Sequence, residues 1–220
     1  MFTKALKTVA ALVFLAAPAA AEMEISIYGG SQSLPHSRIS GNVAGIGPVS
    51  KLIGWDGKSF EAPPYYGARF TWWRTDTFGL GVELTHAKAY APAGEMAPQF
   101  SRLEFTDGHN IVTINASRRW PGLWAKGKLT PYVSGGIGVA IPHVDIQPTV
   151  AGAPHTYGYQ VTGPAVKVGA GIKYDLSDRW ALFTEYQFTW TDNEVDIDGG
   201  GKLSGEILTN AINFGVSYKF

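Results

Sequence analysis

The sequence predicts an all-β protein whose strands close into a single antiparallel barrel. Composition supports this, because the 220 residues include 27 glycines, 13% aromatic residues and only 16% charged residues, which favours strands and turns. Apolar and polar residues alternate over eight segments of about ten residues, the length with which a tilted strand crosses a membrane. The connections between these segments are alternately short and long. Together these observations predict an eight-stranded transmembrane up-and-down β-barrel of the outer-membrane type.

The first 21 residues have the pattern of a secretory signal peptide. Lys4 and Lys7 precede an apolar run, and small residues at Ala19 and Ala21 predict cleavage after Ala21. The run is too short to span a membrane as a helix. Residues 22–220 are then expected to form one barrel domain. The equal numbers of acidic and basic residues give no indication of a nucleic-acid partner, and the absence of cysteine excludes disulfides and thiolate metal sites.

The strands are predicted from the apolar/polar alternation, in chain order. They are residues 23–32, 65–74, 79–90, 105–119, 130–141, 160–174, 179–190 and 206–220. The short connections are 75–78, 120–129 and 175–178, whereas 33–64, 91–104, 142–159 and 191–205 are long. Short periplasmic turns and longer outer loops are typical of outer-membrane barrels.

One face of each predicted strand is apolar and the other is small or polar. In the segment YYGARFTWWR, Phe70 lies on the apolar face and Arg69 on the other. Three further charged residues, Glu83, Lys167 and Glu185, share the face of Arg69. An unpaired charge inside a barrel costs several kcal/mol, so these four residues are predicted to form an ion network in the lumen.

A soluble eight-stranded barrel with an apolar, ligand-binding interior is the alternative. Aromatic residues near the strand ends favour the membrane form, as does the ending NAINFGVSYKF, which resembles the C-terminal signal of bacterial outer-membrane barrels. Inward side chains fill a barrel of eight strands, so transport through the lumen is disfavoured.

The histidines fall in the outer loops or at the outer ends of the strands. A polar, solvated rim is the simplest interpretation, but histidines mixed with Glu104 and other carboxylates can also bind metal or move protons. Asp107 and His109 are predicted to share the inward face of their strand. His86 and Lys88 are predicted to face outward, toward lipid headgroups. The five histidines are His36, His86, His109, His143 and His155.

The run TDNEVDIDGGGKL places acidic residues at alternate positions before three glycines. It lacks the glutamate that ends a calcium-binding loop, so a solvated loop tip is expected. The alternative is that its carboxylates hold divalent ions that bridge to lipopolysaccharide phosphates. The acidic residues are Asp192, Glu194, Asp196 and Asp198.

Several long strings resemble the lipid A oxidase family of Gram-negative outer membranes. They are IYGGSQSLPHSRISG, IGWDGKSFEAPPYYGARFTWWR, GVELTHAKAYAP, FSRLEFTDGHNIVTINASRRWP and TPYVSGGIGVAIPHVDI, and the resemblance covers nearly all of the chain after the signal. It implies oxidation of the proximal glucosamine of 1-dephosphorylated lipid A to 2-aminogluconate, with dioxygen as co-substrate and hydrogen peroxide as product. It also implies location in the outer membrane of a Gram-negative bacterium, with lipid A or lipopolysaccharide as partner, and we expect a monomer.

Such an oxidation needs a base and an acceptor for two electrons. The sequence shows no flavin or nicotinamide motif, which leaves a His/carboxylate divalent metal site or an unrecognised route. Location and chemistry select the catalytic candidates His36, Asp107, His109, His143 and Asp145. Of these, His109, His143 and Asp107 are the candidate metal ligands. Arg38, His86 and Lys88 are the candidate contacts to lipid headgroups, with ordinary solvation as the alternative for each.

Two other functions fit the same sequence. The first is a non-enzymatic structural or adhesive barrel whose outer loops bind partners. The second is hydrolysis of lipid A acyl chains, for which Ser37 beside His36 is only a weak indication.

Overall fold

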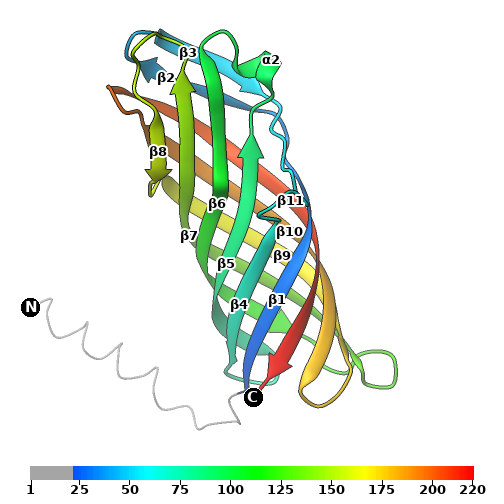
Figure 1. Cartoon of the computed structure of the whole chain (residues 1–220). Helices are drawn as coiled ribbons and strands as arrows, with labels where there is room; N and C mark the ends of the chain where they lie inside the picture. The colour runs from blue at the N-terminus through cyan, green and yellow to red at the C-terminus, as the bar shows by residue number, and fades with distance from the viewer. Residues whose placement is uncertain (1–21) are drawn as a thin grey trace, which may run out of the picture.

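The computed structural model describes residues 22–220 and shows a closed antiparallel barrel (Figure 1). The predicted signal peptide lies outside the described residues. Eight strands follow one another around the barrel in the order β1, β4, β5, β6, β7, β9, β10 and β11, and the pairing of β1 with β11 closes it. The predicted eight-stranded barrel is therefore confirmed. Their bounds are β1 Glu22–Ser33, β4 Tyr66–Trp73, β5 Phe78–Tyr90, β6 Phe100–Arg119, β7 Leu129–Pro148, β9 Gly163–Asp175, β10 Trp180–Asp196 and β11 Gly201–Lys219.

Four smaller elements decorate the outer end of the barrel. Strands β2 (Ser37–Val43) and β3 (Gly47–Ile53) form a hairpin, and β2 pairs with the outer end of β11. Strand β8 (Thr156–Tyr159) pairs with the outer end of β7. The helix α2 (Ala93–Met96) is one turn long. No helix among residues 22–220 is long and apolar enough to span a membrane.

The barrel is apolar outside and polar inside. Arg69 is 4% exposed, whereas the next residue, Phe70, is 39% exposed on the outer face. The same alternation runs along β5, where Leu80, Val82 and Leu84 are exposed and Glu83 is buried. We call the exposed apolar residues on the outer face the apolar belt. In water this belt would be a large exposed apolar surface, so it is the surface that faces lipid.

The strands extend further at the outer end than the sequence indicates. Strands β10 and β11 continue to Asp196 and from Gly201, so most of the predicted loop 191–205 is hairpin. Likewise β7 continues to Pro148. The acidic residues of DNEVDID made this segment look like a loop. They alternate with Val195 and Ile197, which are buried, so the charges lie on the outer face of a strand.

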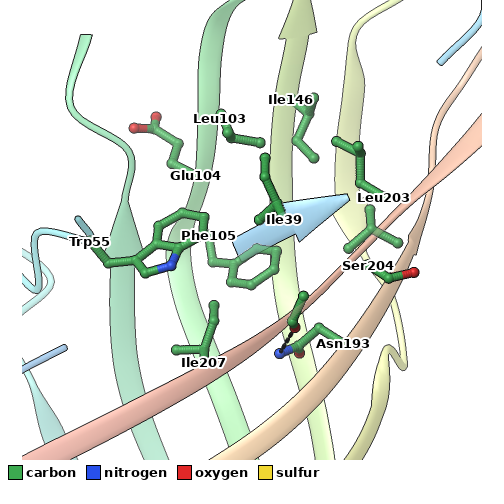
Figure 2. Close-up of a pocket in the computed structure, with 12 residues that line it drawn as sticks. Ile39, Trp55, Leu103, Glu104, Phe105, Ile146, Asn193, Leu203, Ser204 and Ile207 are labelled. Atoms are coloured by element: carbon green, nitrogen blue, oxygen red, sulfur yellow. Dashed lines mark hydrogen bonds between the residues drawn. The ribbon is translucent and has the colours of Figure 1, made fainter. Parts of the chain in front are cut away.

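The hairpin formed by β2 and β3 lies over the outer mouth of the barrel. Its inward side chains pack with the inner faces of the extended strands into one apolar cluster, which leaves a cavity of only about 30 Å³ (Figure 2). In Figure 2, Ile39 of the hairpin, Trp55 and Phe105 converge on this cavity. Asn193 closes its lower side by donating to the carbonyl oxygen of Gly205 (3.4 Å). The outer half of the interior is therefore a packed apolar core rather than an open channel.

An irregular segment completes the wall above the short strand β4. Residues 54–65 pass between the outer ends of β1 and β5, and Gln32 N donates to Ser59 Oγ (2.9 Å). Lys88 Nζ donates to the carbonyl oxygens of Glu61 (2.8 Å) and Pro63 (3.1 Å), and the His86 ring stacks on Tyr66. His86 and Lys88 are only 4% and 1% exposed. Their predicted exposure to headgroups is wrong, because this segment covers Lys88, while Tyr66 of β4 and Asn110 of β6 cover His86.

Candidate functional site

The four charged residues predicted for the lumen lie together at the middle of the barrel. Arg69 bridges two carboxylates: its Nε donates to Glu83 Oε2 (2.8 Å) and its Nη2 to Glu185 Oε1 (2.7 Å). Lys167 Nζ lies 3.1 Å from Glu83 Oε1. Tyr132 Oη donates to the other oxygen of Glu185 (2.8 Å). Two cations thus balance two anions, which is the condition under which burial of charge is tolerated.

A second charged layer lies nearer the periplasmic end. Glu24 forms an ion pair with Lys173, and Arg119 Nη1 lies 2.6 Å from Glu22 Oε1 and 4.0 Å from Glu24 Oε2. Trp73 Nε1 donates to Glu24 Oε2 (3.3 Å). Both layers are made of side chains that satisfy one another. They fill the lumen and stabilise the barrel.

Three predicted catalytic residues lie on the outward side of the barrel wall at the rim. His143 Nδ1 is 3.8 Å from Asp107 Oδ2, and its ring lies between the edges of Tyr157 and Tyr159. Asp145 is held in separate contacts, because Arg102 Nη1 donates to its Oδ2 (2.8 Å) and His155 Nε2 lies 2.6 Å from its Oδ1. This arrangement is an ion cluster beside strand β8 in which Asp107 is exposed, whereas His143 and Asp145 are buried.

The cluster also shifts the ionisation of its neighbours. The hydrogen bond to Asp145 and the charge of that carboxylate raise the pKa of the Arg102 guanidinium. Burial, and then the charge of Asp145, raise the pKa of Glu104. Asp145 thus balances the charge of Arg102.

His109 lies on the inner side of the barrel wall, away from the rim residues. The pairing of β6 with β7 breaks between Phe105 and His109, where Gly108 adopts a φ of +110°. This bulge places Asp107 outside and His109 inside, within 3.3 Å of Asn193 Oδ1. The predicted common inward face is therefore wrong. Nor do His109, His143 and Asp107 form the predicted metal site, since residues 22–220 contain no group of three such side chains arranged to hold a metal.

His36 and Arg38 line a groove on the outer wall, beside the seam where β11 meets β1 and β2. We call this the seam groove, and its volume is about 520 Å³. Leu208 lines its lower part, while Asp192 and Glu206, which are in register on β10 and β11, supply two carboxylates. Arg38 Nη1 donates to Ser50 Oγ (3.0 Å), which leaves the rest of the guanidinium exposed.

The position of the His36 ring depends on Gly54, the residue that follows β3. A Cβ atom at Gly54 would lie 2.5 Å from His36 Nε2, so the imidazole packs directly against the backbone there. Sequence reasoning identified His36 and Arg38, but it missed Glu206 and placed Asp192 in a loop. The alternation of inward and outward residues in β10 and β11 continues beyond the apolar belt, and it places both carboxylates on the outer face.

The acidic residues beyond Asp192 are partly neutralised. Glu194 and Asp196 both form ion pairs with Lys202 across the hairpin of β10 and β11. The predicted loop tip is therefore a strand surface. The structure thus distributes the five catalytic candidates over three places: His36 in the seam groove, Asp107, His143 and Asp145 on the rim, and His109 inside.

Comparisons with known proteins agree with this architecture. Among solved structures, the outer membrane protein AlkL in DMPC bilayers has a TM-score of 0.55 at 13% identity, over 93% of this chain and 92% of that one. OprG from Pseudomonas aeruginosa (TM-score 0.45, 13% identity, 91% and 96% covered) and outer membrane protein W from E. coli (0.42, 17%, 90% and 97%) are also similar.

The identity to AlkL is low, so the likeness to that structure supports the fold alone. A search of curated protein sequences gave no match. The family model described as the outer membrane protein beta-barrel domain matches residues 8–220. This chain therefore belongs to the outer membrane protein beta-barrel domain family, and its location is the outer membrane of a Gram-negative bacterium.

Proposed function

We propose that this protein is a lipid A oxidase that converts the proximal glucosamine of 1-dephosphorylated lipid A to 2-aminogluconate. The long strings that resemble that family support the proposal, since they include the segment SLPHSRISG that supplies His36 and Arg38. In this proposal a single chain acts on a lipid of the outer leaflet.

The observation that carries the proposal is the position of the seam groove. It opens on the outer wall, and Leu208 at its lower part lies four residues along β11 from Ile212 of the apolar belt. In this proposal, the sugar headgroup of a lipid in the outer leaflet lies at this level. The interior offers no comparable route, because two ion layers and the apolar core fill it. A substrate that approaches from the side needs no channel.

The groove contains the groups that the reaction needs for proton transfer and binding. His36 takes the proton of the C1 hydroxyl, the hydrogen on C1 and the electron pair leave, and the ring becomes a lactone. Dioxygen accepts two electrons and two protons and leaves as hydrogen peroxide. Water then opens the lactone to the aminogluconate. Arg38 is suited to contact the remaining anionic groups of the headgroup.

A divalent metal would be one way to help dioxygen accept the electron pair. The predicted ligands do not fit one, because His109, His143 and Asp107 lie on two sides of the wall. The proposed proton steps therefore use the side chains of the seam groove alone.

Purified protein in detergent is expected to release hydrogen peroxide from 1-dephosphorylated lipid A in a 1:1 ratio to product. The product gains one oxygen atom in its mass spectrum. Lipid A that keeps its 1-phosphate is the control, because it has no free C1 hydroxyl to oxidise. Elemental analysis before and after chelation shows whether activity follows a metal. If dephosphorylated lipid A is recovered unchanged under air, the proposal is wrong, and a structural or adhesive role becomes the better explanation.

Replacing Arg38 with alanine is expected to raise the KM for lipid A about tenfold while kcat changes by less than about twofold. A charge-assisted hydrogen bond contributes about 1.5–3 kcal/mol, and 1.4 kcal/mol corresponds to a factor of ten. Initial rates against lipid A concentration in mixed micelles measure both constants. Arg102→Ala, which removes a guanidinium from the rim instead, is the matched control. An unchanged KM for Arg38→Ala would remove Arg38 from the binding surface.

A further inference from the structure

A second groove lies directly below the seam groove, on the lipid-facing wall. Its volume is about 510 Å³ and its lining is almost entirely apolar. Strand β1 forms its floor with Gly29 and Ser31. We call it the chain groove. One wall is Ile212 and Phe214 of β11, and the other is Phe60, Pro64 and Tyr66.

The sequence builds this groove by placing small residues between large ones. Gly29 and Ser31 occupy the outward positions of β1, where Ile25 and Ile27 stand lower down. A Cβ atom at Gly29 would have Tyr65 O at 3.5 Å as its nearest neighbour, so the floor is low because a side chain is absent. Phe60, which is 82% exposed, stands above this floor. A phenyl ring held in that position is suited to contact hydrocarbon rather than water.

The two grooves are continuous along β11. The outward residues of this strand, in order from the belt, are Phe214, Ile212, Asn210, Leu208 and Glu206. The first two line the chain groove and the last two line the seam groove. Only Asn210 separates them, and it accepts a hydrogen bond from Tyr186 Oη (2.6 Å). The wall therefore changes from apolar to charged over the length of one lipid, in the order in which a lipid presents its chain and its headgroup.

We propose that the chain groove binds one acyl chain of the lipid A molecule whose headgroup occupies the seam groove. This inference rests on the proposed function and adds the part of the substrate that fixes its depth. A chain held against β1 orients the proximal sugar toward His36 and Arg38. Binding of the chain and binding of the headgroup then reinforce each other, because both are parts of one molecule.

The position of Gly29 allows the groove to be filled without touching the seam groove. Gly29→Phe places a ring on the floor, and Phe60→Ser removes one wall at an exposed position. Gly135→Phe is the matched control, since Gly135 faces outward on β7, with Lys167 O at 3.9 Å as the nearest atom to its Cβ. Strand β7 is four strands from β1 around the barrel. A heat-shifted band on gels reports that each variant is folded.

Native mass spectrometry of the full barrel with 1-dephosphorylated lipid A measures the bound fraction. Gly29→Phe and Phe60→Ser are each expected to weaken binding about tenfold, whereas Gly135→Phe binds as the wild type does. Phosphatidylethanolamine at equal concentration is expected not to displace lipid A. If it does, or if both groove variants retain lipid A, the acyl-chain site is overturned.

The same variants separate this inference from the proposed function. If the wild type releases no peroxide but Gly29→Phe still loses lipid A, the oxidase proposal fails and the chain site stands. If the wild type is active and Gly29→Phe retains both its activity and its lipid, the chain site fails and the oxidase stands.

Discussion

Replacing Arg69 with methionine is expected to destabilise the folded barrel by about 3–5 kcal/mol, because it leaves two buried carboxylates with too little positive charge. Arg69 contacts both Glu83 and Glu185, and all three side chains are nearly fully buried. Lys167 contacts Glu83 but cannot balance a second anion. Removing Arg69 therefore changes a neutral cluster into one with a net negative charge in a medium of low dielectric.

The measurement is equilibrium unfolding in urea, followed by tryptophan fluorescence and by the heat-shifted band. Arg118→Met is the matched control, since Arg118 is exposed on β6 and its replacement is expected to change stability by less than about 0.5 kcal/mol. Arg69→Met/Glu185→Gln tests the cause. This double variant keeps the pair of Lys167 and Glu83, so it is expected to be more stable than Arg69→Met alone. If the losses of stability simply add, charge balance is not what Arg69 contributes.

The fold and the lumen could be predicted because both depend on a period of two residues. Alternation fixes which side chains face inward, so Arg69, Glu83, Lys167 and Glu185 could be grouped from parity alone. Closure of the barrel then brings them together. In the lumen, the local alternation and the closed barrel therefore place the same side chains inside.

The outer end could not be predicted in the same way. The bulge at Gly108 shifts parity, so Asp107 and His109 separate although only one residue lies between them. Residues 54–65 cover Lys88 and Tyr66 of β4 covers His86, and no local pattern reveals these contacts between distant segments. The seam groove likewise depends on the pairing of β2 with β11, which joins residues far apart in the chain.

His36→Gln is expected to lower kcat for lipid A oxidation at least about a hundredfold, which is the lower end of the effect of losing a general base. His36 is exposed and lines the groove that we assign to the headgroup. Glutamine keeps a polar side chain of similar length but cannot take the proton of the C1 hydroxyl. KM is expected to change little, because Arg38 and the acyl chain remain available for binding.

His155→Gln is the matched control for this experiment. His155 is also a partly exposed histidine of the outer end, but it contacts Asp145 on the rim, on the other side of the mouth from β11. Its loss is expected to leave kcat unchanged, as is the loss of His143, whose ring is enclosed by two tyrosines. Full activity in His36→Gln together with inactivity in His143→Gln would move the reaction from the seam to the rim. Because the two sites lie on different strands, the pair of variants decides which face of the barrel receives the lipid.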